Sequence, residues 1–204
     1  YTILNGNQIG TIMLYYILSF YNEKGKLRKN QFAVCSVVST PLTKKICDHF
    51  GIGFRRTLTG FKWMGNVAEE MVQAGGEFVL AYEEAFGVTF GDSRDKDGVI
   101  SIALMAEAAA WCKKNGRTLL DLIDEMYVTC DLYVEGACEK NYEGASGKER
   151  MGAIMEALRA NPPAAVGGIK VVRCDDVAGG KSTENGKPRS EEHTSELQSS
   201  QSIS

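Results

Sequence analysis

The sequence lacks the long apolar segment that marks a membrane-spanning protein. Its longest apolar run, residues 9–20, already contains Thr11 and Ser19, and a spanning helix needs roughly 20 apolar residues. No basic stretch precedes the run, so it does not have the pattern of a signal peptide. We therefore expect a cytoplasmic protein with no membrane partner.

Cysteine motifs and an excess of charge are also missing. The six cysteines form no CxxC pair, and their spacing fits neither a zinc site nor a dense disulfide scaffold. We interpret them as free thiols in a reducing compartment. The formal net charge is only -3 at pH 7, which gives no electrostatic reason to expect a nucleic-acid partner.

Common catalytic motifs are absent as well. Neither HExxH nor GxSxG occurs, and two partial P-loop matches fail. In one, Tyr142 and Glu149 replace the first glycine and the Ser or Thr, and in the other Asp175 replaces the first glycine. Residues 189–199 resemble the in-frame translation of a sequencing-library adapter, which removes His193 from any catalytic argument. The remaining histidine, His49, lacks the partners of a catalytic triad, and we interpret it as structural or solvated.

The composition nevertheless predicts a folded chain. Hydrophobic residues make up 44% and charged residues 24% of 204 residues, close to a typical globular protein. The chain opens on Tyr1 directly in a structured-looking segment, which suggests a piece cut from a longer protein. After Val177, small and polar residues dominate, so we predict no packed element and a disordered tail over residues 178–204.

Strand and helix patterns alternate along the chain, which predicts an α/β fold with a largely parallel or mixed sheet. A polar loop is expected at residues 83–96, and Thr118 with Asp121 has the spacing of a capping box. Strands are predicted at 32–38, 54–58, 77–82 and 169–173, and helices at 9–21, 41–50, 61–71, 98–112, 118–130 and 147–160.

One loop, residues 57–63, joins a strand to a helix and has the residues of an anion site. A helix start has unpaired N–H groups and partial positive charge. Lys62 in that first turn is unfavourable for a bare helix but suits a bound phosphate. The alternative is that Thr59 only caps the helix and Lys62 is solvated.

Two further loops follow the next strand. Glu83 and Glu84 come directly after an apolar strand, where side chains project into the crevice that binds ligands in α/β sheets. Ionised carboxylates accept hydrogen bonds from sugar hydroxyls. Arg94 and Lys96 lie beside a second helix start, which Asp97 can cap. Either these loops form a sugar-phosphate surface, or they are charged surface loops.

Four motifs, read in order, resemble the α-D-phosphohexomutases, and most closely the phosphoglucomutase/phosphopentomutase-like branch. The resemblance covers about residues 1–177. The motifs are NGNQIG at 5–10, TLTGFKWMGN at 57–66, YEEAFG at 82–87 and RDKDGV at 94–99.

The resemblance implies four domains around a cleft, of which this chain matches the third, a three-layer α/β/α domain. An active-site phosphoserine exchanges a phosphoryl group with the sugar through a sugar bisphosphate intermediate, and Mg²⁺ sits at that serine. The implied division is the end of the preceding domain at 1–30, domain III at 31–116, a helical connector and first strand of the next domain at 117–177, and the tail at 178–204.

The resemblance also assigns roles to residues. Glu83 matches the glutamate that accepts ring hydroxyls, Thr59 and Gly60 match a loop lining the cleft, and Lys96 matches a lysine near the transferring phosphate. Lys62 and Arg94 are placed to assist substrate binding. Glu84, from the acidic strand end, is a further substrate-binding candidate. Ala85 stands where many members have serine, so the choice between glucose and pentose phosphates stays open.

The family's serine loop (TxSHN), metal loop (DGDxDR) and distal phosphate loop (RxSGTEP) do not occur in this sequence. We therefore expect no catalytic residue and no metal ligand here. The chain alone should be inactive, with a sugar phosphate and the missing domains of the same polypeptide as its partners. A free-standing, non-catalytic sugar-phosphate module is one alternative. An unrelated α/β interaction domain is another, favoured if Gly60, Glu83 and Lys96 fail to meet.

Overall fold

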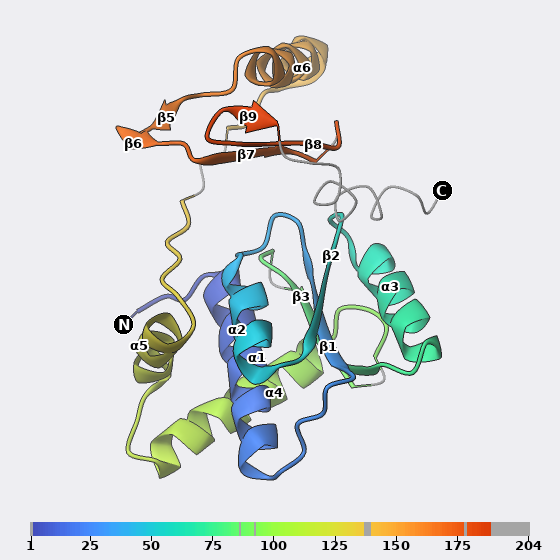
Figure 1. Cartoon of the computed structure of the whole chain (residues 1–204), viewed down its shortest axis with the longest axis vertical. Helices are drawn as coiled ribbons and strands as arrows, with labels where there is room; N and C mark the ends of the chain where they lie inside the picture. Colours follow the sequence, from blue (N-terminus) through green and yellow to red (C-terminus); the bar gives the residue numbers. More distant parts are fainter. Residues whose placement is uncertain (1, 86, 92, 137–139, 178, 189–204) are drawn as a thin grey trace. The chain divides into compact units, whose positions relative to one another are not determined.

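The computed structural model describes residues 2–85, 87–91, 93–136, 140–177 and 179–188. The chain divides into two compact units, Tyr1–Glu135 and Gly136–Ser204. The elements of the first unit, drawn from blue to olive in Figure 1, are α1 (Gly6–Glu23), β1 (Gln31–Ser36), α2 (Leu42–Phe50), β2 (Gly53–Thr57), α3 (Phe61–Gln73), β3 (Glu77–Glu83), β4 (Gly87–Phe90), α4 (Gly98–Lys114) and α5 (Leu119–Thr129).

A four-stranded sheet in the order β2-β1-β3-β4 forms the middle layer of the first unit. β1 pairs in parallel with both β2 and β3, whereas β4 pairs antiparallel with β3. Helix α3 covers one face, and α1, α2 and α4 pack on the other (Figure 1). The predicted three-layer α/β/α fold with a mixed sheet is therefore confirmed.

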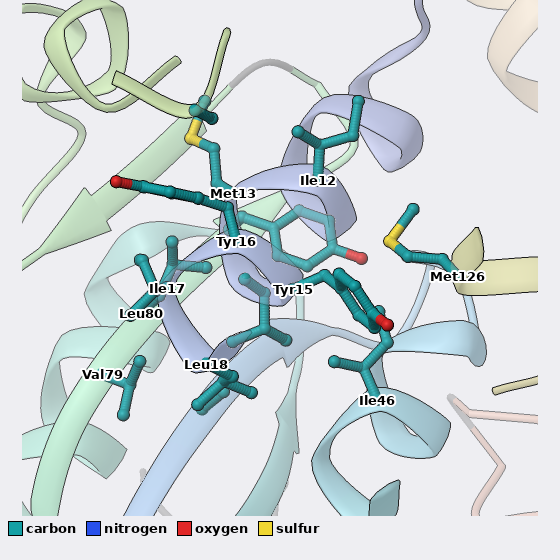
Figure 2. Packing of buried hydrophobic residues seen from close by; sticks show 14 of the residues in the cluster. Ile12, Met13, Tyr15, Tyr16, Ile17, Leu18, Ile46, Val79, Leu80 and Met126 are labelled. Carbon is teal, nitrogen blue, oxygen red and sulfur yellow. The ribbon is translucent and has the colours of Figure 1, made fainter. Parts of the chain in front are cut away.

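The larger core lies between the sheet and α1. Every side chain from Ile12 to Leu18 is at most 3% exposed, because the sheet, α2, α4 and α5 all contact this helix. Figure 2 shows Tyr15 near Ile46 of α2 and Met126 of α5, and Ile17 near Leu80 of β3. The apolar run that is too short to span a membrane is thus the central helix of a protein core.

The smaller core lies on the α3 face. Phe32, Val34 and Ala81 from the sheet pack against Phe61 and Met64 of α3. All six residues of β1 are buried, as expected for a parallel strand covered on both faces. This packing fixes the start of α3 beside the carboxyl end of the sheet.

Two helix starts predicted from the sequence are confirmed. The Asp97 side chain accepts hydrogen bonds from the N–H groups of Val99 and Ile100, and Thr118 and Asp121 form a complete capping box. The prediction of a continuous loop at residues 83–96 is wrong, because β4 lies within it. β4 has only four residues, too few for a clear period-two pattern, and it forms by pairing with β3.

The second unit comprises α6 (Gly144–Ala160), β5 (Ala165–Val166), β6 (Ile169–Lys170), β7 (Arg173–Asp176), β8 (Lys181–Glu184) and β9 (Lys187–Pro188). Its helix is exposed along its whole length except at Gly147. The predicted strand at 169–173 is wrong, since that stretch is divided between two antiparallel pairs.

The prediction of no packed element after Val177 is wrong for β8 and β9. Two-residue turns explain both errors: Gly167-Gly168 and Asn185-Gly186 have positive φ at both positions, the geometry of a type I′ hairpin turn. Residues 189–204, which include the adapter-like stretch, lie outside the described residues.

The two compact units do not coincide with the domain boundaries that the resemblance implies. α1 and α5 share the main core with the sheet, whereas the sequence-based division places both helices outside domain III at 31–116. In the described part of the chain, no helix is long and apolar enough to cross a membrane.

Candidate functional site

The candidate site lies at the carboxyl edge of the sheet, where β1 and β3 end side by side. The chain leaves β1 for α2 on one face of the sheet and leaves β2 for α3 on the other. Such a change of face between adjacent strands opens a crevice where open α/β sheets bind ligands.

The two glutamates at the end of β3 point to opposite faces of the sheet. Successive side chains of a strand alternate in direction, and Ala81 belongs to the α3-side core while Tyr82 belongs to the α1-side core. Glu83 accordingly turns toward the start of α3, and Glu84 turns toward the β1–α2 turn. The two neighbouring carboxylates thus contact different elements on opposite faces of the sheet.

On the α3 side, Glu83 joins two segments that are far apart in the sequence. Its Oε1 accepts a hydrogen bond from the Gly60 N–H at 2.5 Å. Its Oε2 lies 3.2 Å from the Lys96 ammonium nitrogen, and the side chains of Glu83 and Lys96 are 8% and 48% exposed. A nearly buried carboxylate requires such partners, while the half-exposed lysine remains open to an anion. The structure therefore brings Gly60, Glu83 and Lys96 to one rim.

A close approach of β4 supports this arrangement. The Lys96 ammonium lies 5.2 Å from the centre of the Phe61 ring, a cation–π distance. A Cβ at Gly87 would lie 2.5 Å from the Phe61 ring and 2.7 Å from Lys96 Cε. Only glycine fits between them, a constraint that sequence reasoning missed although Gly87 closes the YEEAFG motif.

The start of α3 is organised differently from a simple capped helix. Its N-cap residue is Gly60, with a φ of 114° and no side-chain cap. Thr59 is exposed and does not cap the helix, so the capping alternative does not hold. Lys62 is exposed, and its ammonium lies 5.7 Å from the centre of the Trp63 ring. Thr59 and Lys62 therefore face solvent at a helix start whose Gly60 N–H is bound by Glu83.

Arg94 has different surroundings from the other predicted residues. It is exposed and pairs with Glu69 of α3 at 2.7 Å. Together these two residues line a cleft of about 540 Å³ between α3 and β3–β4. Arg94 lines this cleft, but the other six predicted site residues do not. The cleft and the Glu83 rim are distinct places on the same face of the sheet.

On the opposite side, Glu84 holds two buried serines that the sequence analysis missed. The Ser36 and Ser39 hydroxyls lie 2.8 Å apart and 3.1 and 3.2 Å from Glu84 Oε2. The Thr43 hydroxyl donates to the Thr40 carbonyl and lies 2.5 Å from the Tyr82 hydroxyl. Burial raises the pKa of Tyr82 well above its ordinary value. This side is a packed polar network rather than an open rim.

The described residues do not form a metal centre. No group of three or more His, Cys, Asp or Glu in these ranges could hold a metal ion. His49 is exposed and packs edge-on against Phe50. Cys35, Cys47, Cys112, Cys130 and Cys174 are free thiols, and Cys138 lies outside the described residues. The donor set of this part of the chain therefore does not fit Mg²⁺.

Comparisons with known proteins point to one family. A family model described as phosphoglucomutase/phosphomannomutase, alpha/beta/alpha domain III, matches residues 5–130. Phosphoglucomutases of Staphylococcus aureus are 33% (strain bovine RF122 / ET3-1) and 32% (strain MRSA252) identical over 178 residues, which cover 86% of this chain. This chain spans 31% of the length of these relatives.

A solved structure has a similar fold. The open form of pp63/parafusin, a phosphoglucomutase from Paramecium, matches with a TM-score of 0.55 and 20% sequence identity. The match covers 93% of this chain and 32% of that chain. At this identity the likeness concerns the fold.

Proposed function

The chain belongs to the phosphoglucomutase/phosphomannomutase family through its α/β/α domain III, and on that premise we propose that it binds a sugar phosphate at the Glu83 rim. In the intact enzyme this domain would serve a mutase of the phosphoglucomutase or phosphopentomutase type. That enzyme would move a phosphoryl group between sugar hydroxyls through a bisphosphate intermediate and a phosphoserine.

The meeting of Gly60, Glu83 and Lys96 is the observation that supports this proposal. Each ionised carboxylate oxygen has more than one acceptor position. Glu83 can therefore keep its contacts with Gly60 and Lys96 while accepting a hydrogen bond from a sugar hydroxyl. Lys96, half exposed at 3.2 Å from Glu83, can turn its remaining N–H groups to a phosphate. One rim thus offers an acceptor for the sugar and a cation for the phosphate.

The start of α3 extends this rim. Gly60 supplies no side-chain cap, but its own N–H already donates to Glu83 and the Trp63 N–H donates to the Gly60 carbonyl. The turn would therefore offer an anion the two N–H groups between them and its partial positive charge. Thr59 and Lys62 are exposed at this turn and would contact a ligand bound there. Arg94 is paired with Glu69. It would not contact the ligand and would contribute to phosphate binding only through its positive charge at a distance.

We propose that the chain alone does not turn over substrate. The family's serine, metal and distal phosphate loops do not occur in its sequence, and among the described residues the donor set does not fit Mg²⁺. Phosphoryl transfer requires the nucleophile and the charges around the phosphate to be held together. This chain's own residues would bind and orient the sugar phosphate, and affinity should be weak because the remaining contacts are missing.

The proposal is tested by titrating the purified chain with α-D-glucose 1-phosphate and following ligand saturation-transfer NMR signals. We expect saturable binding that weakens about tenfold in Glu83→Gln and Lys96→Ala, since each change removes a charge-assisted contact. Lys114→Ala, an exposed lysine at the far end of α4, should bind as the wild type does. Equal binding by all four proteins would contradict the assignment, and sugar-phosphate isomerisation by the chain in a coupled assay would contradict its inactivity.

A further inference from the structure

Glu84, the residue after the proposed sugar ligand Glu83, holds a buried pair of hydroxyls on the other side of the sheet edge. Ser36 is fully buried and Ser39 is 3% exposed. Both hydroxyls lie within 3.2 Å of Glu84 Oε2 and 2.8 Å from each other. The three groups form a closed triangle that joins the end of β3 to the turn after β1.

The chemistry of this triangle requires an acceptor oxygen at Glu84. Each serine hydroxyl has one proton to donate. If the two serines bonded only to each other, one of the two protons would lack an acceptor in a buried place, which is unfavourable. Glu84 Oε2 can accept from both. A carboxylate at this position therefore allows two buried hydroxyls to be satisfied in one fixed arrangement.

The turn after β1 is also held from two other elements. The Val37 N–H donates to the Thr57 carbonyl at the end of β2, at 2.8 Å. The Thr40 N–H donates to Asn7 Oδ1 of α1 at 3.0 Å. Among these contacts with the turn, the one from the end of β3 is made by a carboxyl group, that of Glu84.

The turn adjoins the proposed binding rim. β1 and β3 are adjacent parallel strands in which Cys35 is paired with Tyr82. The next residues, Ser36 and Glu83, therefore end their strands at the same level, about 5 Å apart between strands. The turn that follows Ser36 thus starts beside Glu83 at the same edge of the sheet.

We propose that Glu84 is a positioning residue of the sugar-phosphate site: through Ser36 and Ser39 it fixes the β1–α2 turn against the end of β3. This inference rests on the proposed function of the Glu83 rim. Glu84 acts through the two serines and not by contact with the ligand. Removing the acceptor oxygen of Glu84 and removing the two hydroxyls should therefore have the same effect.

The test compares α-D-glucose 1-phosphate dissociation constants of the full chain, the Glu84→Ala variant, the Ser36→Ala/Ser39→Ala variant and the triple variant. We expect about tenfold weaker binding in each, with no further loss in the triple variant, because the substitutions break one shared interaction. Glu84→Gln, which keeps an acceptor oxygen, should stay within about twofold of the wild type.

Tyr82→Phe is the matched control for a merely structural effect. It removes a buried hydrogen bond to Thr43 on the same side of the sheet edge and should lower stability while leaving the dissociation constant unchanged. If Glu84→Ala does not fold, Ser39→Ala, which deletes a single hydroxyl, replaces it and should weaken binding about threefold.

The outcomes separate this inference from the proposed function. Two outcomes overturn this inference alone when the wild type binds. In the first, Glu84→Ala leaves the dissociation constant unchanged. In the second, Glu84→Ala weakens binding but the Ser36→Ala/Ser39→Ala variant binds as the wild type does. Equal weakening in Tyr82→Phe also overturns it, because the effect would then be general to the buried side. If the wild type does not bind glucose 1-phosphate, both proposals fall.

Discussion

The two sides of the carboxyl edge of the sheet differ in how they use neighbouring glutamates. On the α3 side, Glu83 pairs with the half-exposed Lys96 and accepts a hydrogen bond from the Gly60 N–H at the start of α3. On the α1–α2 side, Glu84 is bound to buried hydroxyls beside the buried Tyr82. The difference shows how one strand end can present a ligand-accessible rim on one face and a rigid support on the other.

The largest expected effect on stability comes from crowding the α1–α2 side of the sheet edge around Glu84, which we call the supporting side. A Cβ at Gly6 would lie 1.7 Å from the Glu84 carbonyl oxygen, so Gly6→Ala must displace the backbone at the end of β3. We expect it to lower the free energy of unfolding by about 3 kcal/mol, measured by urea denaturation.

Gly98→Ala is the control for this change. Gly98 is the first residue of α4, and a Cβ there would meet nothing within 4 Å. Its effect should stay within about 1 kcal/mol and favour the helix. A Gly6→Ala variant as stable as Gly98→Ala would show that α1 does not pack against the end of β3.

The supporting side should also make stability sensitive to alkaline pH. Burial raises the pKa of Cys35 from 9.0 to about 11, and burial together with the hydrogen bond to Glu125 raises the pKa of Tyr15 from 10.0 to about 12. The folded state therefore favours the neutral forms. This contribution is complete below pH 9 and is lost as pH rises, between 9 and 11 for Cys35 and between 10 and 12 for Tyr15.

Urea denaturation at pH 8, 9, 10 and 11 measures this loss. Cys35 should contribute at most about 3 kcal/mol of the decrease, from a shift of about two pKa units. In Cys35→Ala the decrease between pH 9 and 11 should be smaller by that amount, whatever the variant's stability at pH 8. An unchanged slope would mean that Cys35 ionises in the folded protein as it does in the unfolded chain.

The smallest effect is expected at the exposed pair on the α3 side. Arg94 and Glu69 are 76% and 37% exposed, and such surface pairs contribute little. Arg94→Ala should change the free energy of unfolding by less than about 1 kcal/mol and the glucose 1-phosphate dissociation constant by less than about threefold. A loss as large as that of Lys96→Ala would place the ligand at the Arg94 cleft instead of the Glu83 rim.

The sequence predicts the α3 side of the sheet edge better than the α1–α2 side. The main strands and helices follow from their periodicity, and the rim residues Gly60, Glu83 and Lys96 were found through motifs. The Ser36–Ser39–Glu84 triangle was missed because its partners are 45 and 48 residues apart and a serine near a strand end has no distinctive local pattern.

The missed strands have a related cause. β4 is defined by its pairing with β3 rather than by its own four residues. The hairpins of the second unit depend on two-residue turns, and the Asn185-Gly186 signal was overlooked within a polar stretch. Local patterns therefore predicted the helices and the longer strands, and failed where pairing or long-range hydrogen bonds decide the structure.

The central claim is most directly tested by mapping where a sugar phosphate binds. Backbone amide shifts of the isotope-labelled chain would be followed during titration with α-D-glucose 1-phosphate, with inorganic phosphate as the reference ligand. The account predicts the largest shifts at Gly60, Glu83 and Lys96, with smaller shifts in the turn after Ser36. Shifts confined to the cleft residues Ala68, Thr89 and Arg94, or spread without a centre over the surface, would contradict it.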